Sequence, residues 1–101
     1  MARAQVMIEG AIPITFLKEG DMFVAYSPVL DLSTCGTTFE EAQRNFHEAL
    51  DIFFDECLKH KTLDRALESL GWQRTHTAHP RWQPPAIVGQ DSLHVSVPAA
   101  R

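Results

Sequence analysis

Carboxylates near the start of the chain are the first side chains that could be catalytic. Glu19, Asp21 and Asp31 lie on or beside neighbouring predicted strands, and clustered carboxylates hold two metal ions in nucleases of the RNase H type. Glu19 and Asp21, however, fall in a predicted turn, and Asp31 falls on the polar side of a strand near its end. The pattern therefore favours solvated carboxylates, and a metal-dependent nuclease is the least favoured alternative.

Histidines and cysteines further along the chain have side chains that can bind zinc. His76-x-x-His79 and His94 offer imidazoles, and Cys35 or Cys57 could add a thiolate. Their spacing is poor for a structural zinc site, and Cys57 falls on the apolar side of a predicted helix. The sequence also has no Cys-His nucleophile signature and no Gly-rich phosphate loop. We therefore predict no catalytic residue, no metal and no cofactor, and a protein that is not an enzyme.

A third set of side chains suits recognition of a partner. Glu40, Glu48, Asp51 and Asp55 fall on the side of a predicted helix that is opposite its apolar residues. The net charge of −4 is the reverse of the basic character that nucleic-acid binding requires, and it suits a basic protein partner. We expect these carboxylates to bind a partner, the alternative being an ordinary solvated surface, and we expect no direct nucleic-acid binding by this chain alone.

Trp82, which lies among prolines, is a further candidate contact because tryptophan dominates binding hot spots. The alternative is that Trp72 and Trp82 fold back onto the core.

The helix that would present the carboxylates has clear signals in the sequence. Thr38-x-x-Glu41 matches a capping box, in which a threonine hydroxyl and a glutamate carboxylate bind backbone amides at a helix start. Apolar residues then recur at helical spacing: Phe39, Ala42, Phe46, Ala49, Leu50, Phe53 and Cys57. These signals predict a helix from about Phe39 to about Lys59, with its apolar side packed on a sheet.

The elements around this helix follow from shorter patterns. Residues 11–18, 22–26 and 30–35 predict three strands, the first two joined as a hairpin, and Gly36 ends the third. A second helix is expected to start at the cap Thr62 and to stop at Gly71.

The last part of the chain carries three prolines, at positions 80, 84 and 85. We predict an extended connector there, followed by a fourth strand over the alternating residues 92–97, which could also pair with a neighbouring copy. The expected fold is α+β in β-β-β-α-α-β order, with a small three- to four-stranded antiparallel sheet under one long helix. Residues 1–72 would form its core, and residues 73–101 the connector and last strand of the same domain.

The location of the protein can also be inferred. The start of the chain is interrupted by Glu9, Gly10 and Pro13 before a signal-peptide core could form, and no run approaches the roughly 20 apolar residues that span a bilayer. Two cysteines do not make a secreted disulfide scaffold. We expect a cytoplasmic protein with reduced cysteines and no membrane contact.

An ordered string of residues resembles a known family. Pro28-x-Leu30 is followed by Gly36-x-Thr38-x-Glu40-Glu41-Ala42 and by Asn45-x-x-Glu48-Ala49-Leu50. This pattern, over roughly residues 16–58, looks like that of the HicB family of antitoxins. Val29 and Leu32-Ser33-Thr34 depart from the acidic residue and the Pro-Gly pair that the family usually has, and the tail lacks the usual C-terminal DNA-binding module.

The resemblance implies a degraded RNase H-like fold and the antitoxin half of a toxin–antitoxin pair. Such a protein binds and blocks a small basic mRNA-cleaving toxin of the HicA type. We expect a homodimer or tetramer, and the alternative is an orphan module of the same fold that binds another protein or a small ligand. The motif residues also have structural explanations, namely a tight turn, a helix cap and close packing: Pro28, Gly36, Thr38, Glu41, Ala42, Asn45 and Ala49.

Overall fold

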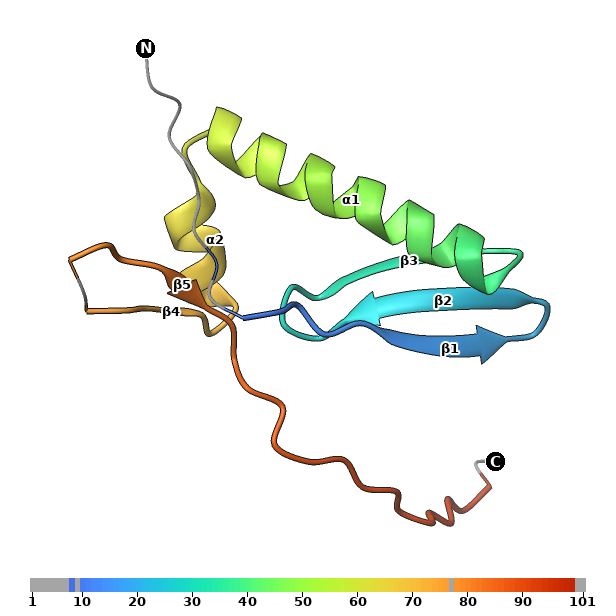
Figure 1. Cartoon of the computed structure of the whole chain (residues 1–101). Coiled ribbons are helices and arrows are strands. Elements are labelled where there is room, and N and C mark those ends of the chain that lie inside the picture. Colours follow the sequence, from blue (N-terminus) through green and yellow to red (C-terminus); the bar gives the residue numbers. More distant parts are fainter. Residues whose placement is uncertain (1–7, 9, 77, 100–101) are drawn as a thin grey trace.

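The computed structural model describes residue 8, residues 10–76 and residues 78–99 (Figure 1). The fold is α+β, with a three-stranded antiparallel sheet, a long helix, a short helix and a small two-stranded sheet. The elements follow one another as β1 (Thr15–Glu19), β2 (Met22–Ser27), β3 (Leu32–Gly36), α1 (Phe39–Lys59), α2 (Leu63–Ser69), β4 (Gln73–Arg74) and β5 (Trp82–Gln83). The predicted fold class and the order of the first five elements are therefore confirmed.

The large sheet has β2 between β1 and β3, and both of its pairings are antiparallel. Phe16, Ala25 and Thr34 form one row across the three strands, and Leu17, Val24 and Cys35 form the next. Since neighbouring residues of a strand point to opposite faces, the first row faces the helix and the second faces away from it.

Two strand boundaries differ from the prediction. β1 starts at Thr15 and not at Ala11, and Pro13, which has no N–H to donate to a ladder, lies in the stretch before it. β3 starts at Leu32 because Val29 and Leu30 belong to the turn after β2, where Asp31 has a φ of 50°. Both of these turn residues are buried, with 3% of Val29 and 4% of Leu30 exposed.

Helix α1 has the predicted bounds and lies across one face of the sheet (Figure 1). Its first half packs on β2 and β3 through the sheet–helix cluster, which consists of Ala25, Ala42 and Phe46 with the partly buried residues Ile14, Phe16, Phe23, Leu32 and Leu50. Two of the three central side chains are single methyl groups, which lets the helix approach the strands closely. The ring of Phe39 stacks on Phe16 at a centroid distance of 4.2 Å but stays 41% exposed.

The second half of α1 runs past the sheet and packs with α2 (Figure 1). There the tryptophan cluster forms, which consists of Val29, Leu30, Cys57, Leu63, Leu67, Trp72 and Trp82. Gly71 ends α2 with a φ of 87°, as expected for a left-handed helix stop. Trp72 then turns inward, and its indole Nε1–H donates a hydrogen bond of 2.7 Å to the carbonyl of Val29. Thr62 starts α2 without a side-chain cap, contrary to the prediction.

The segment after Trp72 contains a hairpin that the sequence did not predict. β4 and β5 pair through Gln73 with Gln83 and Arg74 with Trp82, and Trp82 also forms a parallel bridge with Ile8. The connector is therefore ordered where Trp82 reaches the core, and both tryptophans fold back onto the core.

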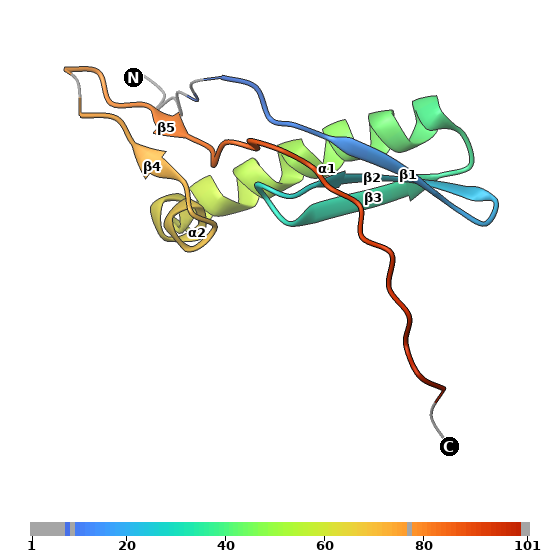
Figure 2. The same cartoon turned by 90° about the horizontal axis from the view of Figure 1, so that it is seen from below.

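The fourth strand predicted over residues 92–97 is wrong for this chain. Residues 88–99, called the C-terminal tail below, form no helix or strand and are exposed throughout. The tail points away from the rest of the molecule in both views (Figures 1 and 2). A strand needs a neighbouring backbone to pair with, and the tail meets none.

Among the described residues, no helix is long and apolar enough to cross a bilayer.

Candidate functional site

The outward side of α1 carries the carboxylates that the sequence analysis selected. Glu40, Glu48, Asp51 and Asp55 are all exposed, opposite the buried residues Ala42, Phe46 and Cys57 of the same helix. The structure brings Glu48, Asp51 and Asp55 together, since residues three and four apart are neighbours on a helix surface. Glu40 is separated from them by one basic residue, Arg44, which is also exposed. The continuous acidic surface is thus formed by three carboxylates.

An exposed isoleucine borders this acidic surface and was missed by the sequence analysis. Ile52 is 62% exposed, and it lies one turn from Glu48 and close to Asp55 by helical spacing. The signal was available, because Ile52 falls outside the series Phe46, Leu50, Phe53 and Cys57 that faces the core. An apolar side chain among charges is a common arrangement at protein interfaces, where a small desolvated contact is surrounded by polar groups. We refer to Glu48, Asp51, Ile52 and Asp55 as the α1 surface.

The charges on the α1 surface are not neutralised by strong ion pairs. The nearest pairing is between His47 Nδ1 and Asp51 Oδ2 at 3.7 Å, and both side chains are at least 70% exposed. Ion pairs of this kind contribute little because water screens them. The carboxylates therefore remain available to a basic partner.

The motif residues gather around the junction between β3 and α1. Thr38 Oγ1 accepts a hydrogen bond from Glu41 N at 3.0 Å, as predicted for the cap. The Glu41 carboxylate, however, accepts from Thr37 N at 3.0 Å and not from the amide of Thr38, so the capping box is displaced by one residue. Asn45 Nδ2 donates to the Cys35 carbonyl at 2.9 Å and ties the helix to β3.

The remaining motif residues also have structural roles. A Cβ on Gly36 would lie 2.6 Å from Ala42 N, so only glycine fits at this turn. Ala49 is partly buried on the sheet side of α1. Pro28 lies exposed in the turn that follows β2, where the absence of an N–H suits the end of a strand.

Trp82 is not an exposed contact residue. It belongs to the tryptophan cluster and is 6% exposed. The guanidinium of Arg74 lies 4.8 Å from the centre of its ring and also pairs with Asp64 at 3.0 Å. The candidate role of Trp82 as a partner anchor on the free surface is therefore withdrawn.

The carboxylates considered for metal binding lie at opposite ends of the sheet. Glu19 and Asp21 flank the turn between β1 and β2, whereas Asp31 lies in the turn between β2 and β3. The whole of β2 separates the two turns, and Asp31 Oδ1 accepts a hydrogen bond from the Tyr26 hydroxyl at 3.3 Å. Across the described part of the chain, no three His, Cys, Asp or Glu side chains come together as metal ligands.

The histidines and cysteines are likewise dispersed. His76, His79 and His94 are exposed residues of the C-terminal part. Cys35 is exposed on β3, Cys57 is buried in α1, and both are free thiols.

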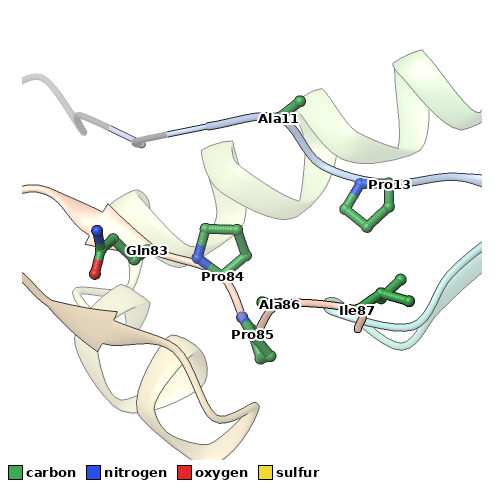
Figure 3. Close-up of a pocket in the computed structure, with 7 residues that line it drawn as sticks. All are labelled: Ala11, Pro13, Gln83, Pro84, Pro85, Ala86 and Ile87. Atoms are coloured by element: carbon green, nitrogen blue, oxygen red, sulfur yellow. The ribbon is translucent and has the colours of Figure 1, made fainter. Parts of the chain in front are cut away.

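A shallow pocket lies between the segment before β1 and the segment after β5 (Figure 3). Its lining is mainly proline and small apolar residues: Ala11, Pro13, Gln83, Pro84, Pro85, Ala86 and Ile87. No side chain of this lining is ionisable, so the pocket offers no acid, base or nucleophile. The α1 surface, in contrast, carries charged side chains, and it is the candidate site.

Comparison with known proteins gives no matching family model, no matching curated protein and no matching solved structure.

Proposed function

We propose that this protein is an antitoxin-like binding protein, which binds and blocks a small basic mRNA-cleaving toxin of the HicA type through the α1 surface. The observation that carries the proposal is the acidic, exposed outward side of α1, whose nearest ion pair is the weak one of His47 with Asp51, with Ile52 at its border. The ordered motif around the start of α1 supports it, because that motif resembles the HicB family. We further propose that the protein acts in the cytoplasm as a homodimer or tetramer and is not an enzyme.

The mechanism follows from charge and shape. A basic ribonuclease must expose a positive surface to hold RNA, since phosphate contacts supply most of the affinity for nucleic acid. The carboxylates of Glu48, Asp51 and Asp55 would attract that surface and speed the encounter. Ile52 would exclude water beside the acidic contacts, and the bulk of α1 and the sheet would then keep RNA away from the toxin.

A second candidate function is an orphan module of the same fold that binds another protein or a small ligand. The features of the α1 surface are compatible with any basic protein partner. The two candidates differ in whether a short reading frame for a basic protein lies beside the gene, and in whether its product binds this chain.

The test is co-purification with that basic product, followed by an RNA-cleavage assay of the product with and without this protein. A triple variant, Glu48→Lys, Asp51→Lys and Asp55→Lys, is expected to weaken binding by roughly a hundredfold, at about 1 kcal/mol per reversed exposed charge. The difference should shrink in high salt because salt screens exposed charges. RNA cleavage should be restored in parallel.

The matched control reverses three exposed carboxylates elsewhere, Asp21→Lys, Asp64→Lys and Glu68→Lys, and so changes the net charge equally. It should bind almost as the unmodified protein does. Ile52→Ala should weaken binding without changing folding, since Ile52 is 62% exposed. Equal loss in both triple variants would show that net charge matters and the α1 surface does not, and failure of the basic product to bind at all would remove the antitoxin proposal.

A further inference from the structure

The C-terminal tail has the side-chain pattern of a strand but no strand to pair with. Leu93, Val95 and Val97 are 81%, 74% and 80% exposed, and they alternate with the polar residues Ser92, His94 and Ser96. Alternation of this kind marks a strand with one buried side. In the single chain, both sides of the tail face water.

The dimensions of the chain exceed those of a compact domain of its length. The radius of gyration is 17.1 Å, whereas a compact domain of 100 residues has about 13 Å. The molecule measures 61 × 29 × 26 Å, and the tail points outward in both views (Figures 1 and 2). A segment with the pattern of a buried strand therefore lies outside the fold of its own chain.

The outer edge of β1 is the open edge of the large sheet. Within the described residues, β1 pairs with β2 alone, which leaves its other side without a ladder. The opposite edge strand, β3, packs against α1, and the side chain of Asn45 already donates a hydrogen bond to the carbonyl of Cys35. Unpaired edges of this kind add strands from other chains readily unless they are blocked. Apolar side chains border the β1 edge on both faces of the sheet: Phe39, 41% exposed, lies on the α1 side against Phe16, and Leu17, 46% exposed, lies on the opposite face.

The tail is poorly placed to pair with β1 of its own chain. Trp82 is fixed in the tryptophan cluster, and the chain then passes Pro84 and Pro85 while facing Pro13 across the shallow pocket (Figure 3). Prolines lack the N–H that a ladder requires, so a ladder between the segment before β1 and the segment after β5 is interrupted in both segments. The ten residues from Val88 to Val97 can span about 33 Å when extended, which is long enough to reach the β1 edge of a neighbouring copy.

We propose that residues 92–97 add as a strand to the outer edge of β1 in a second copy of this chain, and that the two copies exchange tails reciprocally about a twofold axis. Leu93, Val95 and Val97 then lie on the α1 side of the sheet, beside Phe16 and Phe39, and the polar residues of the tail lie on the opposite face. A reciprocal exchange closes the assembly and uses the same surfaces twice. The proposal rests on the homodimer of the proposed function and names its contact, and it is separate from toxin binding, which uses the α1 surface and is tested by the RNA-cleavage assay.

The experiment combines molar mass by light scattering with amide hydrogen exchange on the full chain. We expect an assembly of at least twice 11.4 kDa, in which alternate amides of residues 92–97 are protected because every second N–H of an added strand enters the ladder. Val95→Asp places a carboxylate on the buried side of that strand. It should raise the dissociation constant of the assembly at least about a hundredfold. Burying an unpaired charge costs several times the free energy that corresponds to a tenfold change in that constant.

The matched control is Ser96→Asp, which adds the same charge to the neighbouring residue on the opposite side of the strand. It should leave the assembly intact, and neither variant should change the fold of the chain because both positions are exposed in it. A monomer at all concentrations would overturn the proposal, whether the tail amides are protected by the same chain or not protected at all. An assembly that survives Val95→Asp, or whose tail amides exchange freely, would overturn it as well.

Discussion

The two hydrophobic clusters of this protein are built in different ways. The sheet–helix cluster joins β2 to the first half of α1 with two small buried residues, Ala25 and Ala42, and only one large side chain that is fully buried, Phe46. The tryptophan cluster fills a wider space with large residues from five segments: the turn after β2, the end of α1, α2, Trp72 beyond it and β5. One cluster depends on close approach of two elements, and the other depends on two tryptophans that arrive from later in the chain.

This difference separates local from long-range specification. The buried residues of the sheet–helix cluster, Ala25, Ala42 and Phe46, lie in consecutive elements from β2 to α1, whereas Trp72 and its hydrogen-bond partner Val29 are 43 residues apart. Leu32 and Leu50 contact both clusters and are the side chains that join them. The variants below test whether the two clusters unfold together or separately.

Trp72→Ala is expected to have the largest effect. It removes a side chain that is 3% exposed and leaves the Val29 carbonyl without its indole donor. We expect a loss of about 3–5 kcal/mol in the free energy of unfolding, as for other tryptophan truncations in cores. Urea unfolding followed by circular dichroism measures it.

A second readout decides how the clusters are coupled. If the tryptophan cluster unfolds separately, amides of α2 and β4 should lose hydrogen-exchange protection while those of β2 keep theirs. Uniform loss would show a single cooperative unit. Trp72→Phe keeps an aromatic ring but not the N–H, so its loss should be smaller, at about 1–3 kcal/mol for an unpaired carbonyl. An equal loss in both variants would mean that the hydrogen bond, and not the packing, matters most.

Gly36→Ala perturbs the close approach between β3 and α1, beside Ala42 of the sheet–helix cluster. The added Cβ would lie 2.6 Å from Ala42 N and 2.9 Å from the carbonyl carbon of Glu41, so backbone must move. Overpacking of this kind costs about 1–3 kcal/mol. Thermal unfolding measures the loss, and the protection of α1 amides near its start should fall first.

Gly89→Ala is the matched control for this substitution. A Cβ at Gly89 meets nothing within 4 Å, and surface substitutions usually stay within about 0.5 kcal/mol. Equal stability of the Gly36 and Gly89 variants would refute the close approach between β3 and α1 on which the sheet–helix cluster depends.

Sequence reasoning recovered the half of the fold that is specified locally. The bounds of α1 follow from a threonine cap and an apolar series, both of which act within a few turns of the helix. The hairpin of β4 and β5 could not be predicted, because its strands have two residues each and form where Trp82 reaches a core made by other segments. Residues 92–97, which were predicted to form a strand, do alternate between polar and apolar side chains. Alternation does not say, however, whether a partner strand exists in the same chain.

The candidate site shows the same division. Exposure of Glu48, Asp51 and Asp55 followed from their position opposite the apolar series, and the structure agrees. The sequence left Trp82 open between a partner contact and a fold-back onto the core, because a tryptophan among prolines has the same local sequence whether it points inward or outward. Only the distant contact with the tryptophan cluster decides its direction.

The caps of the two helices provide a smaller test. Thr38→Ala removes the hydroxyl that accepts from Glu41 N at 3.0 Å, and the loss of such a cap costs about 1 kcal/mol. Thr62→Ala changes the corresponding residue of α2, which makes no side-chain cap, and should lose clearly less. Chemical unfolding of the two variants side by side measures the difference. Similar losses would indicate that the tryptophan cluster does not substitute for a cap in holding the start of α2.

Ser27→Ala is expected to have the smallest effect, and its sign is informative. Ser27 is the last residue of β2 and is fully buried, at 0% exposed, and its hydroxyl oxygen has no hydrogen-bond partner among the described residues. It pairs with Leu32, which joins the two clusters. A buried hydroxyl without a partner keeps its full desolvation cost, so its replacement by a methyl group should leave stability unchanged or raise it by up to about 1 kcal/mol. Ser33→Ala, on the exposed neighbour of Leu32, is the control and should be neutral. A loss of stability in Ser27→Ala alone would mean that the hydroxyl is hydrogen-bonded in solution, and that the junction of the two clusters contains a polar contact as well as the shared packing of Leu32 and Leu50.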